Sequence, residues 1–149
     1  MDAKERAKKL LGDMNTIYLA TNGESGYPDV RAVSVTKSDG LAAVWMLTGV
    51  LEEGMESKLA EVAKNPKCMI YTTAMEDDEN YVELRLCGTA EILQDSESRD
   101  AVWHDVYYRY FPKGKDDPNL RVLKFTTSSA RIQTESVRET VLFGQGKTV

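Results

Sequence analysis

Hydroxyl and ammonium side chains lie on either side of a short loop in the first half of the sequence. Thr48-Gly49 ends an apolar run, and Ser57-Lys58 opens a segment with helical spacing. A helix N-terminus presents unpaired N–H groups and a partial positive charge, the hydroxyls add donors, and the ammonium supplies a full countercharge. Together these groups suit a phosphate dianion. A Ser-Lys pair at a helix start is more often a solvated surface pair, so the pattern alone favours that simpler interpretation.

The second candidate is an arginine among small and apolar residues on an expected strand. In the stretch GYPDVRAV, the strand begins after a proline, and Arg31 and Val33 share one of its faces. A charge on such a face is costly unless an anion or a carbonyl meets it, so contact with a ligand phosphate or ring carbonyl is one interpretation. A cross-strand salt bridge explains the pattern equally well.

The elements that must position these residues are mainly short strands. Alternating or β-branched runs predict strands at 16–21, 29–36, 41–47, 68–74, 81–93, 120–126 and 130–134. Gly88, inside the longest run, predicts a bulge or a close backbone approach. Because no βαβ alternation occurs, six or seven local strands favour a closed antiparallel sheet, in a mainly β fold with peripheral helices.

Three amphipathic segments predict the helices. Asp2 caps a helix that ends near residue 12, and residues 57–63 form a second helix. Ser96 caps a third helix, which we expect to run from 97 towards 110. These helices are insertions between strands and do not form a layer of their own.

Composition limits the class of protein. The 149 residues are 42% hydrophobic and 29% charged, which suits one domain over residues 1–143 and a disordered tail at 144–149. The formal charge of −5 argues against a nucleic-acid partner. No apolar run approaches the roughly 20 residues that cross a bilayer. The N-terminus also lacks the apolar stretch of a secretory signal, so we expect a cytoplasmic protein that does not engage a membrane.

Histidine and cysteine are too few for a metal centre built from these ligands. His104 is the single histidine, and Cys68 and Cys87 lie in apolar runs, where reduced, buried thiols are expected. We therefore expect no structural metal and no disulfide. A site with oxygen ligands alone stays open as an alternative.

Four stretches occur along the chain in a recognisable order. They are GYPDVRAV, then AVWMLTG continued by SKLAEVAKNPKCMIYTT, then YVELRLCGTAEI, and finally YFPKGKDDPNLRVLKF. With them the chain resembles the FMN-binding split barrels related to pyridoxamine 5′-phosphate oxidase, and among these the bacterial general stress protein branch. The resemblance covers about residues 3 to 133. It implies an antiparallel split β-barrel of six to seven strands, and a homodimer with FMN at the two-fold interface.

The resemblance also implies which residues hold the cofactor: three on the strand that borders the flavin, four on the strand beneath it, and a pair at the phosphate. In that order they are Arg31, Ala32, Val33, Trp45, Met46, Leu47, Thr48, Ser57 and Lys58. An isoalloxazine ring is apolar on its faces and polar along one edge, which suits backbone groups along its rim. A positive Arg31 near that edge is expected to raise the flavin redox potential.

Two positions depart from the family pattern. The true oxidase carries an Arg-x-His substrate motif near its C-terminus, whereas His104 here lies in VWHDV, so vitamin B6 oxidation is not expected. Stress-protein relatives often carry an aromatic residue near the last strand, where this chain has Gln133. The aromatic residues between Trp103 and Phe111 are expected to form core or dimer contacts, with flavin stacking the less favoured role.

The expected function is that of an FMN-dependent oxidoreductase with an unidentified small-molecule redox substrate. Flavin N5 would accept or give hydride, and the protein would supply position, shielding and charge. No acid–base pair stands out, so no catalytic side chain is assigned. Two alternatives stay open: a flavin-binding stress or redox-buffering module without efficient turnover, and a relative that binds deazaflavin F420 or haem. A single histidine makes haem the less favoured of these.

Overall fold

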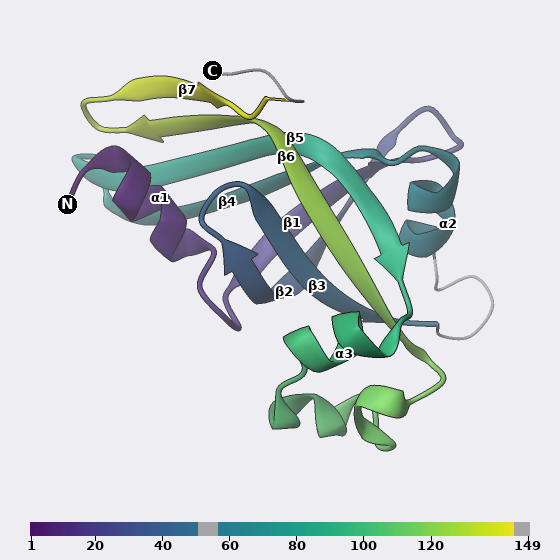
Figure 1. Ribbon diagram of the computed structural model, residues 1–149. Coiled ribbons are helices and arrows are strands. Elements are labelled where there is room, and N and C mark those ends of the chain that lie inside the picture. The colour runs from purple at the N-terminus through teal and green to yellow at the C-terminus, as the bar shows by residue number, and fades with distance from the viewer. Residues whose placement is uncertain (51–56, 145–149) are drawn as a thin grey trace.

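Seven antiparallel strands dominate the computed structural model, which describes residues 1–50 and 57–144. The strands are β1 (Thr16–Asn22), β2 (Pro28–Asp39), β3 (Ala43–Gly49), β4 (Lys67–Asp77), β5 (Asn80–Leu93), β6 (Leu120–Thr134) and β7 (Arg138–Leu142). They are ordered β3-β2-β1-β4-β5-β6-β7, and an additional β3–β6 pairing closes six of them into a barrel. Strand β7 extends the sheet as a hairpin with β6 (Figure 1). The predicted mainly β fold with an antiparallel barrel is confirmed.

The core fills the barrel because side chains alternate along each strand. On β1, for example, Ile17 and Leu19 point inward and are completely buried, whereas Tyr18 between them is 44% exposed. Among the described residues, Phe125 of β6 is the largest fully buried side chain. Burial of this kind contributes roughly 25 cal/mol for each Å² of apolar surface removed from water.

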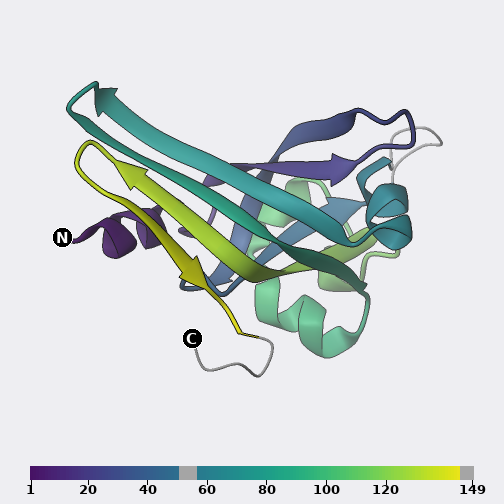
Figure 2. The ribbon, with the colours of Figure 1, turned by 90° about the horizontal axis from the view of Figure 1, so that it is seen from above.

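Two short helices lie at opposite ends of the barrel (Figure 2). Helix α1 (Ala3–Leu10) begins as predicted at Asp2, whose carboxylate accepts a hydrogen bond from the Glu5 backbone N–H at 2.8 Å. It packs against β5 and β6. Helix α2 (Ser57–Lys64) packs against β1 and β5.

The third predicted helix is shorter than expected. Helix α3 (Ser96–Val102) is capped by Asp95 instead of Ser96, and it ends because Trp103 takes an extended backbone conformation. The 3₁₀ helices η1 (Asp105–Arg109) and η2 (Gly114–Asp116) follow. Together these segments cover a second apolar cluster outside β3 and β6, built from Val102, Tyr107, Phe111, Leu120 and Val122, with Trp45, Leu47, Leu93 and Trp103 at its edge. Part of the aromatic segment is therefore core, as predicted.

Strand β6 is also longer than predicted. The segments 120–126 and 130–134 form one strand, because the residues between them continue the ladder with β5. Strand β7 was not predicted. Gly88 lies at a register shift, and a Cβ there would stand 2.1 Å from the Thr126 carbonyl oxygen. The predicted bulge and the predicted close approach are both present at this glycine.

The structure bears only in part on three further sequence predictions. Both cysteines are free thiols, with Cys68 buried and Cys87 half-buried. In the described ranges, no helix has the length and apolar character needed to cross a membrane. Apart from Gly144, the expected disordered tail at 144–149 lies outside the described residues. A single domain over residues 1–143 stays a prediction.

Candidate functional site

Strands β2 and β3 separate in the middle of the barrel. The last pair between them is Val35 with Met46. Before Val35, β2 pairs with β1, and after Met46, β3 pairs with β6. Within the described residues, no strand pairs with the two facing edges past this point. Their backbone N–H and C=O groups are therefore available to a ligand. The predicted positions 31–33 and 47–48 lie on these two edges.

Arg31 shares the inner face of β2 with Val33, as predicted, and its guanidinium has three partners. Nη1 donates to Thr21 Oγ1 at 2.7 Å and to the Leu19 carbonyl at 3.2 Å, and Nη2 lies 3.3 Å from Glu61 Oε1. The Thr21 hydroxyl also donates to Glu61 Oε1 at 2.6 Å. An ion pair is present, but its carboxylate comes from α2 and not from a neighbouring strand.

Lys58 stands beside Arg31 at the start of α2. Its side chain is half-buried, and burial followed by the charge of Arg31 lowers the pKa of Lys58. Ser57 is the first residue of α2, but its side chain lies outside the described part of the structure. An ammonium that has lost part of its hydration beside a guanidinium is stabilised by an anion, so the structure brings together two of the predicted cofactor-binding residues, Arg31 and Lys58.

Two carboxyl groups adjoin the guanidinium. A side-chain hydrogen bond to Glu61 is the main cause that raises the pKa of Asp29. Burial acts to raise the pKa of Glu61, but hydrogen bonds from Asp29, Thr21 and Arg31 outweigh it and lower that pKa overall. A shared proton therefore stays longer on Asp29, and Glu61 is the carboxylate that forms the ion pair with Arg31.

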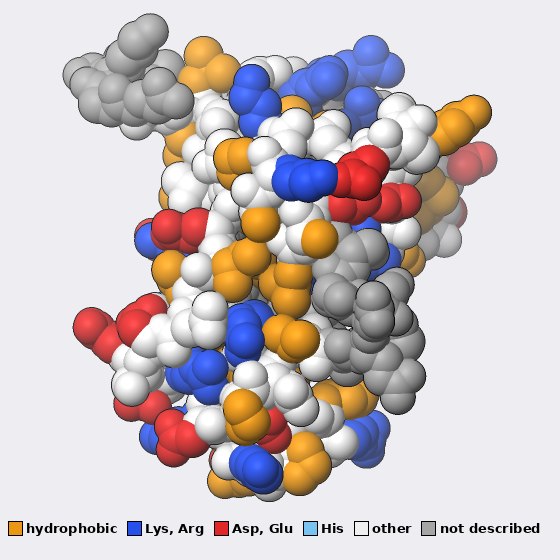
Figure 3. All heavy atoms as spheres, turned by 90° about the vertical axis from the view of Figure 1, so that its right-hand side faces the viewer, with side chains coloured by type: hydrophobic (Ala, Val, Ile, Leu, Met, Phe, Trp, Pro, Cys, Tyr) orange, Lys and Arg blue, Asp and Glu red, His pale blue; other side chains and the backbone are white. Residues whose placement is uncertain are grey.

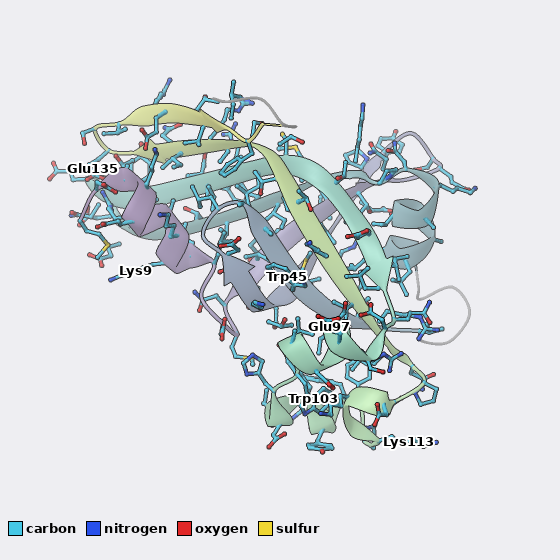
Figure 4. All side chains as sticks on the ribbon, in the orientation of Figure 1. Lys9, Trp45, Glu97, Trp103, Lys113 and Glu135 are labelled. Atoms are coloured by element: carbon cyan, nitrogen blue, oxygen red, sulfur yellow. The ribbon has the colours of Figure 1, made fainter. Side chains whose placement is uncertain are left out.

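The predicted residues of β3 face two ways. Met46 and Thr48 point into the barrel and are buried, so only their backbone can meet a ligand at the open edge. Trp45 and Leu47 point outward into the second apolar cluster. Trp45 lies above α3 in Figure 4, with the ammonium groups of Lys37 and Lys124 at 4.9 and 5.5 Å from its ring centre. The side chains of Trp45 and Leu47 therefore do not gather with Arg31 and Lys58.

The outer face of the sheet carries a row of mainly apolar side chains, which we call the outer row. Strand pairing places its members side by side across six strands: Val30, Ala20, Met69, Cys87, Ser129 and Leu142. Val30 is 63% exposed and Leu142 is 56% exposed. Ala32, the third predicted residue of β2, points to this face beside Tyr18.

Three cavities lie beside the predicted residues and are not lined by them. A cavity of about 420 Å³ opens over the middle of the outer row, between Ala20, Met69 and Cys87. Two others, of about 460 and 520 Å³, are lined by β5 to β7 and by α1. Figure 3, which looks onto the side that carries α2, shows apolar side chains gathered in the middle of that face with charged groups above and below.

Two residues of the site were missed at the level of sequence. Thr21 lies at the end of a predicted strand, and nothing in the local pattern distinguishes it from other threonines. Glu61 lies three positions after Lys58, a spacing that places both on one side of a helix and could have indicated a shared site. Their contacts with Arg31 join residues 10 and 30 positions apart, which local periodicity does not report.

Comparisons with known proteins identify the family and the fold. The family model described as "Pyridoxamine 5′-phosphate oxidase like" matches residues 2–146. A Clostridium acetobutylicum protein, described as related to general stress protein 26 of B. subtilis and as belonging to the pyridoxinephosphate oxidase family, is 29% identical. Its structure superposes with a TM-score of 0.78, over 95% of this chain and 96% of its own. A comparison with curated proteins gives no match.

Two further solved structures show the fold alone, because their identities are low. General stress protein 26 from Bacillus anthracis is 17% identical, with a TM-score of 0.73 over 96% of this chain and 100% of its own. A heme-binding protein from Mycobacterium smegmatis is 19% identical, with a TM-score of 0.73 over 95% of this chain and 58% of its own. Similar barrels thus occur in a protein described as a general stress protein and in one described as a heme-binding protein.

Proposed function

Because this chain belongs to the pyridoxamine 5′-phosphate oxidase-like family, we propose that it binds FMN and acts as an oxidoreductase on a small-molecule substrate. The observation that carries the proposal is that Arg31 lies beside the half-buried Lys58 at the start of α2. Bound FMN supplies hydride exchange at its isoalloxazine ring. The chain's own residues bind the phosphate, orient the ring and exclude water.

The residues of the site fit a terminal phosphate. Arg31 offers a planar fork of donors and Lys58 a point charge, and both suit phosphate oxygens. The first turn of α2 contains no acidic residue, so its N–H groups and partial positive charge are not opposed there. Ser57 begins this turn and completes the proposed phosphate site. A dianion can therefore bind in a protein whose net charge is −5.

The polar edge of the ring needs a different set of groups. The open edges of β2 and β3 offer backbone donors and acceptors near Ala32 and Val33 on one side and near Leu47 and Thr48 on the other. These groups are fixed by the pairing of each strand on its other side, so they require little reorganisation when a ligand binds. We propose that they hold the rim of the ring, and that Arg31 is near enough to favour the reduced, anionic flavin.

A second subunit is part of the proposal. The three cavities given above are not lined by the predicted residues. The outer row and the neighbouring Tyr18 leave apolar surface exposed on the same sheet. Contiguous exposed apolar surface is typical of interaction sites. We propose a homodimer that covers the outer row and encloses FMN at the interface.

The spectrum of the freshly purified protein tests the cofactor. We expect a flavin spectrum, and acid release of a chromophore with the mass of FMN. A deazaflavin or haem spectrum contradicts the proposal. Haem would need an axial ligand, and His104 is the single histidine of the chain. Its Nε2 lies 3.0 Å from the Thr36 carbonyl oxygen and is engaged there, which disfavours haem. Size-exclusion chromatography with light scattering tests the dimer.

Turnover is tested separately from binding. Stopped-flow mixing of the reduced protein with oxygen or with quinones measures the rate of flavin reoxidation. Rapid reoxidation supports an oxidoreductase. Slow reoxidation with all acceptors supports the alternative of a redox-buffering module that binds flavin without efficient turnover.

A further inference from the structure

A cluster of arginines outside the flavin site lies on the outer face of β5, β6 and β7. Strand pairing arranges the side chains of this face in two neighbouring rows, Arg85–Arg131–Thr140 and Glu83–Gln133–Arg138. Residues paired directly across antiparallel strands point to the same face, so all six side chains stand together. They line a cleft of about 460 Å³, which we call the arginine cleft.

The positive charge in the arginine cleft is only partly compensated. Arg85 stands directly opposite Arg131, and like charges in this position destabilise a sheet. Among the residues that the structure describes, Arg131 and Arg138 have no carboxylate within 4.0 Å. Glu139 also lines the cleft but makes no ion pair with them. Two exposed guanidinium groups therefore face the cleft without a protein counterion.

Glu83 and Gln133, on the other side of the cleft, form hydrogen bonds with residues other than Arg131 and Arg138. Glu83 accepts hydrogen bonds from Arg85 at 2.9 Å and from the Tyr71 hydroxyl at 2.8 Å. Gln133 donates to the Tyr81 hydroxyl at 3.2 Å. Because Glu83 is engaged by two donors, it holds Arg85 in place and does not compete for Arg131.

We propose that the arginine cleft binds a small organic or inorganic oxyanion, with Arg131 and Arg138 as its main ligands and Arg85 as a fixed neighbour. Guanidinium groups form paired, charge-assisted hydrogen bonds with carboxylate and phosphate, and either group fits this chemistry. An anion placed between the opposed arginines also removes their repulsion. This inference goes beyond the proposed FMN site and does not depend on it.

NMR of the arginine Nε–Hε groups tests the proposal on protein saturated with FMN, so that the Arg31 and Lys58 site is filled. Inorganic phosphate and succinate are added in separate titrations, with sodium chloride at matched ionic strength as the reference. We expect saturable shifts of the Arg131 and Arg138 signals with one or both oxyanions and none with chloride. The two titrations show which oxyanion the cleft prefers, and binding of either supports the proposal.

Substitution gives the second arm. Arg131→Gln combined with Arg138→Gln should weaken oxyanion affinity by about tenfold or more, since both guanidinium groups lose their charge-assisted hydrogen bonds to the anion. Arg109→Gln, which removes an exposed charge on η1, is the matched control and should leave affinity unchanged. Arg138→Gln alone serves if the double variant is unstable. Equal shifts with chloride, or unchanged affinity in the variants, overturns the proposal.

The experiment distinguishes failure of the arginine-cleft proposal from failure of the FMN proposal. If the protein takes up no FMN, the same titration is made on Lys58→Gln, in which the proposed phosphate site is disabled. Oxyanion shifts at Arg131 and Arg138 in that variant support the cleft even though the flavin proposal has failed. Absence of these shifts there overturns the cleft as well.

Discussion

Nη2 of Arg31 lies 3.3 Å from Oε1 of Glu61, so the guanidinium on β2 is joined to α2 by a partly buried ion pair. The contact connects the open strand edge, where the flavin ring is proposed to lie, with the helix whose first turn is proposed to hold its phosphate. The same contact partly neutralises Arg31. A phosphate that binds beside Lys58 therefore competes with a carboxylate for this arginine.

Glu61→Gln should strengthen FMN binding. The amide still accepts the hydrogen bond from Thr21, but it no longer opposes the charge of Arg31. We expect a gain in affinity of about fivefold, the size of a modest ion pair, measured by quenching of flavin fluorescence. Glu91→Gln, an exposed carboxylate on β5, is the control. A loss of affinity in Glu61→Gln alone would show instead that the carboxylate is needed to position Arg31.

FMN affinity should fall as the pH rises into the alkaline range. Burial and the charge of Arg31 lower the pKa of Lys58 in the free protein, and a bound dianion raises it again. Binding above the lowered pKa therefore takes up a proton, and affinity decreases with increasing pH there. Dissociation constants measured over a pH series check this. Lys58→Arg should bind with a flatter profile, and a profile that is equally steep in both proteins argues against Lys58 as the titrating group.

Asp117 should make stability depend on acid pH. This buried residue accepts hydrogen bonds from the backbone N–H groups of Asn119 at 3.0 Å and Lys113 at 3.1 Å. The Asn119 bond is the main cause that lowers the pKa of Asp117. Because the folded-state pKa lies below the unfolded one, the stabilisation is complete above the unfolded pKa and is lost as the pH falls through the folded pKa.

Thermal unfolding over a pH series measures this effect. Asp117→Asn should lower the melting temperature at neutral pH and reduce its decline towards acid. Asp116→Asn, the exposed neighbour, is the control and should change neither. An unaltered acid decline in Asp117→Asn would assign the pH dependence to other carboxylates.

Gly88→Ala should destabilise the fold strongly. The added Cβ would stand 2.1 Å from the Thr126 carbonyl oxygen and 2.8 Å from Phe125 Cζ, so the backbone of β6 must move. We expect a loss of about 2–4 kcal/mol in the free energy of unfolding, measured by urea denaturation. Gly26→Ala, where a Cβ meets open space at φ +87°, should cost only about 1–2 kcal/mol. Equal losses in the two variants would contradict the close approach at Gly88.

Val30→Glu should break the proposed dimer. Val30 is 63% exposed in the single chain, so a charge there leaves the barrel intact but places an unpaired carboxylate in the outer row. We expect a monomer with weakened FMN binding, measured by analytical ultracentrifugation. Val106→Glu, 54% exposed on η1, should stay dimeric. A dimer that survives Val30→Glu at micromolar concentration would place the interface elsewhere.

Local pattern predicted most of the barrel because its strands alternate with period two. The residues of β6 that follow Thr126 are threonine and serine, which resemble a turn, and pairing with β5 and β7 keeps them extended. The helix after Asp95 ends early because Trp103 leaves helical geometry and packs beside the second apolar cluster. Neither effect is visible in a short window of sequence.

The candidate site was also predictable from the sequence only in part. Arg31 and Lys58 were candidates for contact with an anion from their residue types, although a salt bridge and a solvated surface pair explained the same patterns. Glu61 and Thr21 gain their importance only when α2 folds against β1, which is a tertiary contact. The arginine cleft was missed for the same reason, since Arg85 and Arg131 are neighbours only through strand register.

The most direct test of the central claim is FMN affinity in Arg31→Gln and Lys58→Gln, measured by flavin fluorescence together with melting temperature. Lys64→Gln is the matched control, because this exposed lysine lies on α2 and pairs with Glu24. We predict that each of the first two variants stays folded and loses about tenfold or more in affinity, while Lys64→Gln binds like the unmodified protein. Unchanged affinity in both Arg31→Gln and Lys58→Gln would contradict the account.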